Sequence, residues 1–305
     1  MTGKINCDKC GRYPIFYRRP YEGIVLCRRC FKDSIERKVR RTISKYKMFS
    51  PTDHIGVAVS GGKDSLTLLY ILRKIEEGYP EARITALAVD EGIKGYREEA
   101  LRLAESFTAK LGVNLRTISF KELYGKTMDE MVNALGLRFP CSCCGVLRRK
   151  ALIELASRIG VDKIATAHNL DDEAQTVILN LIHGDPLRIL MTGPTLDGGG
   201  SFIKKVKPLF LIPEKEISLY AYLTGIPFQS RSCPYASTAL RNDVRAMLNL
   251  VEEKHPGTLY TIVHSAEKLR QASSKLFPKR TMRCKLCGSL STSEICSSCK
   301  ILKDI

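Results

Sequence analysis

The chain has 305 residues, of which 44% are hydrophobic, and carries 49 Lys and Arg against 32 Asp and Glu, a formal charge of +17. It has no apolar run of about eighteen residues, which argues against a membrane span and a membrane partner. Residues 1–4 contain no apolar signal region, so we expect a cytoplasmic protein. The charge favours a polyanionic partner such as nucleic acid, although a basic surface can also serve solubility alone.

Twelve cysteines fall into three groups, one near each end and one in the middle. Cytoplasmic thiols stay reduced, so clustered cysteines indicate metal binding or catalysis rather than disulfides. Each end group consists of two CxxC pairs, a pattern typical of tetrahedral zinc sites, and the alternative is free thiols without metal. The end groups are Cys7, Cys10, Cys27 and Cys30, and Cys284, Cys287, Cys296 and Cys299. We expect two Zn²⁺ ions, in modules of residues 1–32 and 276–305.

Residues 33–50 are predicted to be a basic linker helix, which either packs against the core or faces RNA. Strands then alternate with helices through a catalytic domain of residues 51–275. Strands are expected at 55–59, 84–89, 115–120, 163–167 and 202–206. Helices are expected from 63 and at 97–111, 145–159, 170–182, 213–223 and within 235–275, with a loop at 184–200. This order predicts an α/β fold, a parallel sheet with helices on both faces.

The first predicted strand runs into a glycine loop that opens a helix. Its residues are Ser60, Gly61, Gly62, Lys63, Asp64 and Ser65. Glycines let the backbone approach an anion, and the amides at a helix start favour phosphate. Lys63 adds a point charge, and the two serines can donate hydrogen bonds. The loop is too short for a Walker A motif. It predicts a phosphate site, against the alternative of a tight strand–helix turn.

His168 and Asn169 follow a later predicted strand, and Asp171 and Asp172 open the next helix. Strand ends at one edge of a parallel sheet converge on the ligand crevice. The two carboxylates can hold Mg²⁺ between phosphate oxygens. Alternatively, they only cap the helix.

Cys141 and Cys144 form a central CxxC pair, predicted to lie just before a helix, where thiols have a lowered pKa. Cys233 lies far downstream. Three thiolates can hold three irons of a [4Fe-4S] cluster and leave the fourth iron open to sulfide. The alternatives are zinc with a fourth ligand such as His168, or a persulfide on two of the cysteines. Cys143 best fits a small buried apolar residue.

The SGGKDS loop resembles that of the PP-loop enzymes, or N-type ATP pyrophosphatases. The AHNLDDEAQT segment is similar to the GHxxDDxAET motif of PP-loop tRNA-modifying enzymes, with Ala167 and Gln175 replacing Gly and Glu. With the FPCxxCG pair, the late cysteine and both end quartets, nearly the whole chain resembles the tRNA 2-thiouridine synthetases. The similar subgroup has zinc fingers at both ends and includes the T-loop thiolases and the wobble-uridine thiolases.

This resemblance implies that ATP adenylates O2 of a tRNA uridine, that sulfur attacks C2, and that AMP leaves. It implies that residues 60–65 bind ATP together with His168 and the Asp pair, and that a [4Fe-4S] cluster is held by Cys141, Cys144 and Cys233. These cysteines, Lys63 and Asp172 are the expected catalytic residues, and Arg148 is expected near ATP or the adenylated intermediate.

The preferred target is uridine 54 of the T-loop, with the wobble uridine 34 as the alternative. The partners implied are tRNA and a sulfur donor such as a ubiquitin-like sulfur carrier protein or free sulfide, with a homodimer as one option. Two other classes compete: a metabolic adenylating amidotransferase or sulfurtransferase, and a zinc-ribbon nucleic-acid-binding protein without catalysis.

Overall fold

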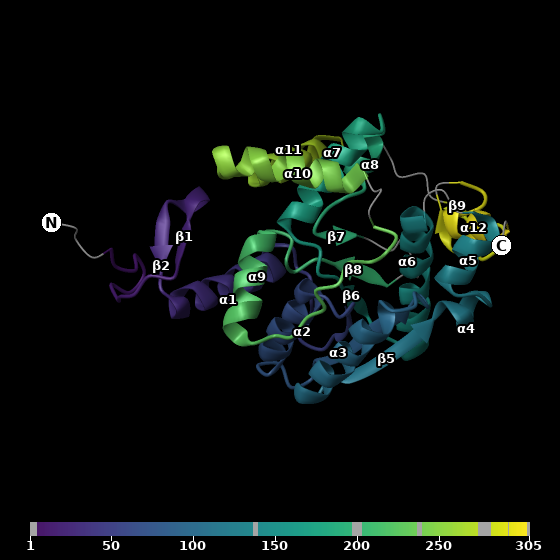
Figure 1. The fold of residues 1–305 in the computed structure, drawn as a ribbon, viewed down its shortest axis with the longest axis horizontal. Helices are drawn as coiled ribbons and strands as arrows, with labels where there is room; N and C mark the ends of the chain where they lie inside the picture. The colour runs from purple at the N-terminus through teal and green to yellow at the C-terminus, as the bar shows by residue number, and fades with distance from the viewer. Residues whose placement is uncertain are drawn as a thin grey trace.

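The computed structural model describes residues 5–136, 140–196, 203–236, 240–273, 282–291 and 293–303. Within them, an α/β core carries a small module at each end of the chain (Figure 1). Phe139, residues 197–202 of the predicted loop and strand, and residues 276–281 of the C-terminal module lie outside the described residues. None of the described helices combines the length and hydropathy that a membrane span requires.

The core is built on a six-stranded sheet in the order β5-β4-β3-β6-β8-β7. Its parallel strands are β3 (His54–Ala58), β4 (Arg83–Asp90), β5 (Asn114–Ser119), β6 (Lys163–Ala165) and β8 (Lys204–Val206). The edge strand β7 (Thr195–Leu196) pairs antiparallel with β8. The predicted parallel sheet is thus confirmed, with one antiparallel addition. That strand and the short helix α8 (Pro186–Leu190) fall where a loop was expected, and that part of the prediction was wrong.

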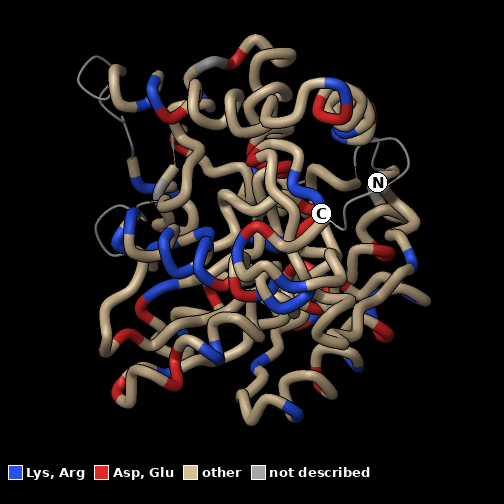
Figure 2. Tube along the Cα trace, turned by 90° about the vertical axis from the view of Figure 1, so that its left-hand side faces the viewer, with Lys and Arg blue, Asp and Glu red and all other residues tan. Residues whose placement is uncertain are grey.

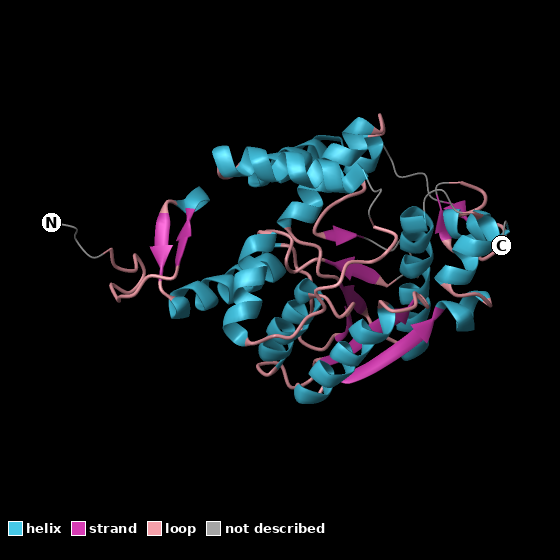
Figure 3. Ribbon diagram, viewed as in Figure 1, coloured by secondary structure: helices cyan, strands magenta, loops and turns pink. Residues whose placement is uncertain are grey.

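Helices cover both faces of the sheet, as predicted (Figure 3). Successive side chains of a strand point to opposite faces of the sheet, so each strand contributes to the apolar core on both faces. In β4, Ile84, Ala86 and Ala88 join one core cluster, and Leu87 and Val89 join the other. The first cluster includes residues of α1 (Arg28–Lys45), α2 (Lys63–Glu76), α3 (Arg97–Lys110) and α9 (Glu214–Thr224). The second includes residues of α4 (Phe120–Tyr124), α5 (Met128–Leu135) and α6 (Pro140–Ile159).

A third group of helices lies beyond the β7 edge of the sheet (Figure 1). It consists of α7 (Leu170–Ile182), α10 (Leu240–Lys254) and α11 (Thr258–Ser273), and α7 contacts both of the others. The break between α10 and α11 falls at Pro256 and Gly257, as the sequence predicts. Helix α7 has the predicted bounds because its start carries a capping box and its apolar face is periodic.

Each end module packs on a helix of the core. The N-terminal hairpin consists of β1 (Tyr17–Arg19), the 3-10 turn η1 (Pro20–Glu22) and β2 (Ile24–Leu26), and α1 follows it. Helix α1 contacts α9, so the basic linker is a packed helix. The C-terminal module has β9 (Met282–Arg283), β10 (Leu290–Ser291) and α12 (Ser297–Lys303), and α12 contacts α6.

Candidate functional site

The glycine loop after β3 has the geometry of an anion site. Gly61 has a φ of +82°, and a Cβ there would lie 2.4 Å from the Ala100 carbonyl oxygen, so only glycine fits. The Ser60 amide donates to Ser65 Oγ at 3.0 Å, and the Gly62 amide donates to Ser60 Oγ at 3.3 Å. Gly62 is the N-cap of α2 without a side-chain cap bond, which leaves the first helix amides available to a phosphate.

Lys63 and Asp64 join this loop to α9. The Lys63 ammonium lies 2.6 Å from Glu214 Oε1 and 3.1 Å from Asp64 Oδ1. Burial raises the pKa of Asp64 to about 6, with Lys63 opposing and Glu214 and Asp172 adding to the rise. Asp64 Oδ1 is buried and makes no hydrogen bond within the described structure. The sequence reasoning missed Glu214, because the partners are 151 residues apart.

Asp171 and Asp172 both act as helix caps, in different helices. Asp172 forms a capping box with Asn169 at the start of α7, with amide–oxygen distances of 3.0 and 3.2 Å. Asp171 Oδ2 accepts from the Glu214 amide at 2.7 Å and so caps α9. Burial raises the pKa of Asp171 to about 6, and the charges of Glu214 and Asp172 add to it.

The carboxylates beside the loop suit a magnesium ion. Mg²⁺ is bound in proteins through one or two carboxylates together with substrate phosphates and water. Asp64 supplies a buried oxygen with no hydrogen bond, and the charge of Asp172 acts on it. The residues present therefore fit Mg²⁺ held together with phosphate. The capping of α7 by Asp172 and of α9 by Asp171 does not use every oxygen of these two carboxylates.

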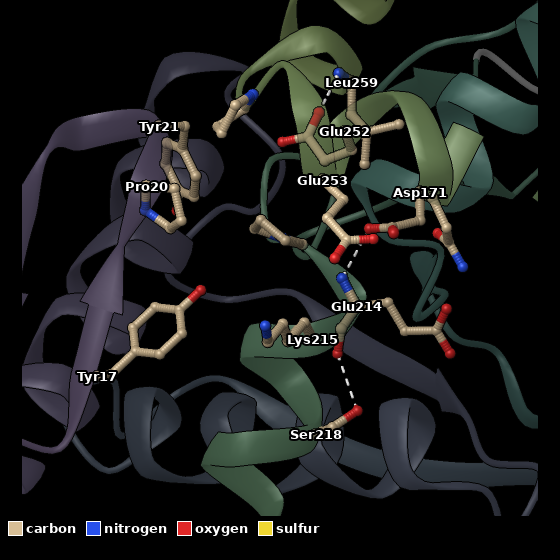
Figure 4. Close-up of a pocket in the computed structure, with 13 residues that line it drawn as sticks. Tyr17, Pro20, Tyr21, Asp171, Glu214, Lys215, Ser218, Glu252, Glu253 and Leu259 are labelled. Carbon is tan, nitrogen blue, oxygen red and sulfur yellow. Dashed lines mark hydrogen bonds between the residues drawn. The ribbon is translucent and has the colours of Figure 1, made fainter. Parts of the chain in front are cut away.

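A cavity of about 520 Å³ lies on the other side of Asp171 and Glu214. Figure 4 shows Tyr17 and Tyr21 of the N-terminal hairpin on one side of it and Glu252 of α10 across from them. Its lining also includes Glu253, so carboxylates dominate its charge. A phosphate is disfavoured in such surroundings, so this cavity does not suit the phosphates of a nucleotide.

The central cysteines lie inside helix α6, and the prediction that they precede a helix was wrong. Helix α6 begins at Pro140, a residue that suits a first helical position. Cys141 and Cys144 therefore lie about one turn apart on one helix face. The predicted lowering of their pKa was also wrong. Burial raises the pKa of Cys144 to about 11 against the opposing charge of Arg148, and burial and Cys233 raise that of Cys141. Cys143 is half-buried and packs beside them.

Cys233 reaches α6 because its segment is fastened at several points. The Gln229 amide donates to the Gly61 carbonyl at 3.2 Å, and Arg231 Nη1 donates to the Gly95 carbonyl at 2.7 Å. The Cys141 thiol donates to the Tyr235 carbonyl at 2.9 Å. Residues 229–235 thus run from the phosphate loop to the first turn of α6, which carries Cys141 and Cys144 and is called the cysteine turn below.

Cys233 packs against the same core cluster as Cys144. In the described ranges, only the two end quartets gather three or more candidate ligand atoms within 4.8 Å of one another. A zinc site built from the central cysteines and His168 therefore has no geometric support. A cubane spaces its cysteine sulfurs more widely, because each binds a different iron. The charge of Cys233 acts on both Cys141 and Cys144, so the three thiols of these two joined segments lie near one another, as a shared cluster requires.

Arg148 links the cysteines to the phosphate loop. Its Nη2 donates to Cys144 Sγ at 3.3 Å, and its guanidinium pairs with the buried Glu91. Glu91 also pairs with Arg97 at 2.9 Å, and Arg97 Nη1 donates to the Ser60 carbonyl at 2.7 Å. The sequence reasoning missed Glu91 and Arg97, although Glu91 follows a predicted strand at the same sheet edge as the other site residues.

His168 lies at the same edge, after β6, with Nδ1 3.0 Å from Thr166 Oγ1. The side chain is exposed at the surface, but neighbouring protein atoms and then the Lys207 charge lower its pKa to about 4, against the opposing effect of Asp172. The imidazole is therefore neutral near pH 7 and lies among cations.

Both end quartets have the geometry of zinc sites. The sulfurs of Cys10 and Cys27 lie 3.7 Å apart, as do those of Cys287 and Cys296. A tetrahedral ion with Zn–S bonds of about 2.3 Å requires a sulfur separation of about 3.8 Å. Backbone amides, led by that of Cys296, lower the pKa of Cys284 to about 6. The four thiols of each quartet and their sulfur separations therefore match a tetrahedral Zn²⁺ site.

Comparisons with known proteins agree with this arrangement. The model of the PP-loop domain family matches residues 32–252. A probable sulfurtransferase from Methanocaldococcus jannaschii is 37% identical over 298 residues, which cover 96% of this chain and 86% of that protein. The cytoplasmic tRNA 2-thiolation protein 1 of Xenopus laevis is 35% identical over 302 residues, which cover 99% and 88%.

Among solved structures, the chain is similar to the U34-tRNA thiolase NcsA from Methanococcus maripaludis, determined with its [4Fe-4S] cluster. The TM-score is 0.88 at 34% identity, and the match covers 100% of this chain and 97% of that one. By its matched domain and by its full-length relatives, the chain belongs to the PP-loop domain family and, within it, to the family of the tRNA 2-thiolation proteins.

Proposed function

We propose that the chain catalyses the ATP-dependent 2-thiolation of a tRNA uridine. The observation that carries this proposal is the joining of residues 229–235 to both the phosphate loop and the cysteine turn of α6. An ATP-activating site and a sulfur-handling site are thereby held side by side. The names of the similar proteins support the same reaction.

In the first step, uridine O2 attacks the α-phosphorus of ATP and pyrophosphate leaves. Residues 60–65 bind the pyrophosphate through loop and helix amides, and Lys63 supplies a positive charge. Asp64, Asp171 and Asp172 would hold Mg²⁺, which would supply positive charge to the phosphates. Since Glu214 pairs with Lys63, we expect ATP to compete with Glu214 for the lysine ammonium.

In the second step, a sulfide attacks C2 and AMP leaves with the former O2. A [4Fe-4S] cluster on Cys141, Cys144 and Cys233 would supply an open iron that binds exogenous sulfide. Arg148 Nη2 can donate to the Cys144 thiolate as it does to the thiol, so this contact orients that ligand. The raised thiol pKa values mean that the metal-free cysteines are protonated and release protons on binding metal.

The remaining assignments concern metals and partners. Each end quartet binds one structural Zn²⁺, in modules of residues 1–32 and 276–305 that flank a linker of residues 33–50 and a catalytic domain of residues 51–275. Lys and Arg lie along many segments of the side of the molecule drawn in Figure 2, with Asp and Glu between them, which suits contact with tRNA. The names of the relatives support a cytoplasmic location.

The similarity to a U34-tRNA thiolase supports the wobble uridine 34 over uridine 54 as the target. The sulfur donor is either free sulfide or a ubiquitin-like sulfur carrier protein, since both deliver sulfur at the sulfide level.

The test is anaerobic reconstitution with iron and sulfide, followed by turnover with tRNA transcripts, ATP and Mg²⁺. We expect 2-thiouridine at position 34 by mass spectrometry of nuclease fragments, and none in a transcript with cytidine at 34. Loss of product only in a transcript with cytidine at 54 would instead assign the T-loop. Alanine at Cys141, Cys144 or Cys233 should abolish thiolation, and Cys143→Ala should retain most of it. Full thiolation by iron-free protein would overturn the cluster mechanism in favour of a persulfide.

A further inference from the structure

Two basic residues beside the cysteine turn have no role in the site as described. Arg149 follows Arg148 on α6 and is solvent-accessible. A Cβ added at Gly145 would lie 3.5 Å from Arg149 Nη1, so the guanidinium folds back over the first turns of the helix. Long side chains on a helix point toward its N-terminus, which explains this direction. The guanidinium therefore lies near the cysteines.

Lys205 approaches the same place from the sheet. Strand β8 runs parallel to β6 with Lys205 opposite Ile164, so both side chains point to one face. Ile164 belongs to the core cluster of α6, which identifies that face as the α6 side. Partial burial and the charges of Arg149 and Lys207 lower the pKa of Lys205 to about 8. Lys205 is thus close enough to Arg149 to be repelled by it.

Among the described residues, no carboxylate pairs with either cation, and neither the Arg149 nor the Lys205 side chain makes a hydrogen bond or an ion pair. Their basic neighbours are engaged: Arg148 with Glu91, and Lys207 with Glu173 at 2.6 Å. Like charges gathered without a counter-ion disfavour each other, and an anion between them relieves the repulsion.

The position of this pair decides which anion it takes. The strand order places β8 beyond β6, on the side away from β3 and its phosphate loop. Lys205 is therefore separated from the phosphate loop by β6, and the charges of Lys207 and Arg149 act on His168 at the end of β6. The base that is adenylated and thiolated must lie between the nucleotide and the cysteines. Besides ATP and the sulfide, the reaction brings the backbone phosphate of the tRNA nucleotide that carries this base to this region.

We propose that Arg149 and Lys205 form a binding site for the backbone phosphate of the tRNA nucleotide whose base is thiolated. This inference rests on the proposed function. It assigns to the pair a positioning role, since a phosphate held on α6 and β8 fixes where the attached base can lie.

The test measures binding of tRNA and of ATP separately, with the holoprotein. The double variant Arg149→Gln, Lys205→Gln should raise the Kd for tRNA by about tenfold or more, as expected for lost hydrogen bonds to a charged group. It should lower the slope of log K against log salt by about one, and leave the Kd for ATP unchanged. The matched control is Arg102→Gln, Lys110→Gln, which removes the same charge from exposed positions of α3 on the opposite face.

A modified RNA locates the contact. A methylphosphonate 5′ to uridine 34 removes one phosphate charge. It should weaken binding to the wild-type protein by about tenfold and have little further effect on the double variant, because the two changes remove one interaction. The charge-conserving Lys205→Arg should bind both RNAs like the wild type and excludes loss of fold as the cause.

Unchanged tRNA binding by the double variant would overturn the proposal. Weaker ATP binding with intact tRNA binding would assign the anion to ATP and overturn it as well. If the wild-type protein thiolates no tRNA, the proposed function fails, and that outcome is distinct from a variant that behaves like an active wild type.

Discussion

Glu216 of α9 fastens the N-terminal module to the catalytic domain, and Glu216→Leu is expected to be strongly destabilising. The carboxylate is fully buried and accepts from Arg19 Nε and Nη2 at 2.8 and 2.9 Å and from Tyr21 Oη at 2.7 Å. The leucine variant leaves the Arg19 side chain, 1% exposed, with only Glu22 and Ser34 as partners. Breaking a buried pair by removing one partner costs about 3–5 kcal/mol. Since Glu22 still compensates part of the charge, we expect a loss of about 3 kcal/mol.

The assay is urea unfolding of the zinc-loaded protein, followed by circular dichroism and extrapolated to water. Arg19→Met, Glu216→Leu should recover most of the loss, because apolar residues of similar size can replace both buried charges. Glu122→Gln, which breaks an exposed ion pair with Arg158, is the control and should remain close to wild type. A Glu216→Leu variant as stable as that control would refute the reasoning.

Three further outcomes are expected. Protein with Cys141, Cys144 and Cys233 all changed to alanine should retain about two zinc per chain by metal analysis, and a value near zero would remove the zinc assignment. Lys63→Ala should stay folded by circular dichroism yet lose ATP use, and ATP labelled at the α-phosphate should give AMP during wild-type turnover; ADP as the sole product would contradict a pyrophosphatase. Because Lys205 has a pKa of about 8, with Arg149 and Lys207 facing it, its amine is charged below that pH and neutral above it. The affinity for tRNA should therefore fall as the pH rises through about 8, and Lys205→Arg should remove this fall; an unchanged pH profile in that variant would rule out Lys205 as the titrating group.

The elements that the sequence predicts well are those whose signals are local. Helix α7 has its expected bounds because Asn169 and Asp172 cap it and its apolar positions repeat at helical spacing. The glycine loop is recognisable because Gly61 must adopt a positive φ against the Ala100 carbonyl. Such features need only neighbours along the chain and one close approach.

What the sequence does not reveal depends on distant packing. The start of α6 was expected at Gly145, but contacts of Cys144 and Leu147 with the sheet continue the helix back to Pro140. The same burial reverses the expected direction of the cysteine pKa shift, because desolvation of a thiolate exceeds the effect of the nearby arginine. The pairing of Lys63 with Glu214 joins residues that no local pattern connects.

The end modules show how a peripheral metal site can act on the centre. Their basic residues suggest RNA contact, yet each module is also packed on a helix that positions site residues. Lys150 of α6 approaches Cys299 Sγ at 3.8 Å, and Ile301 and Leu302 of α12 pack into the cluster that contains Cys144. At the other end, Arg19 holds α9, whose first residue Glu214 pairs with Lys63. We therefore expect metal binding at either quartet to stabilise a helix on which the phosphate loop or the cysteine turn depends.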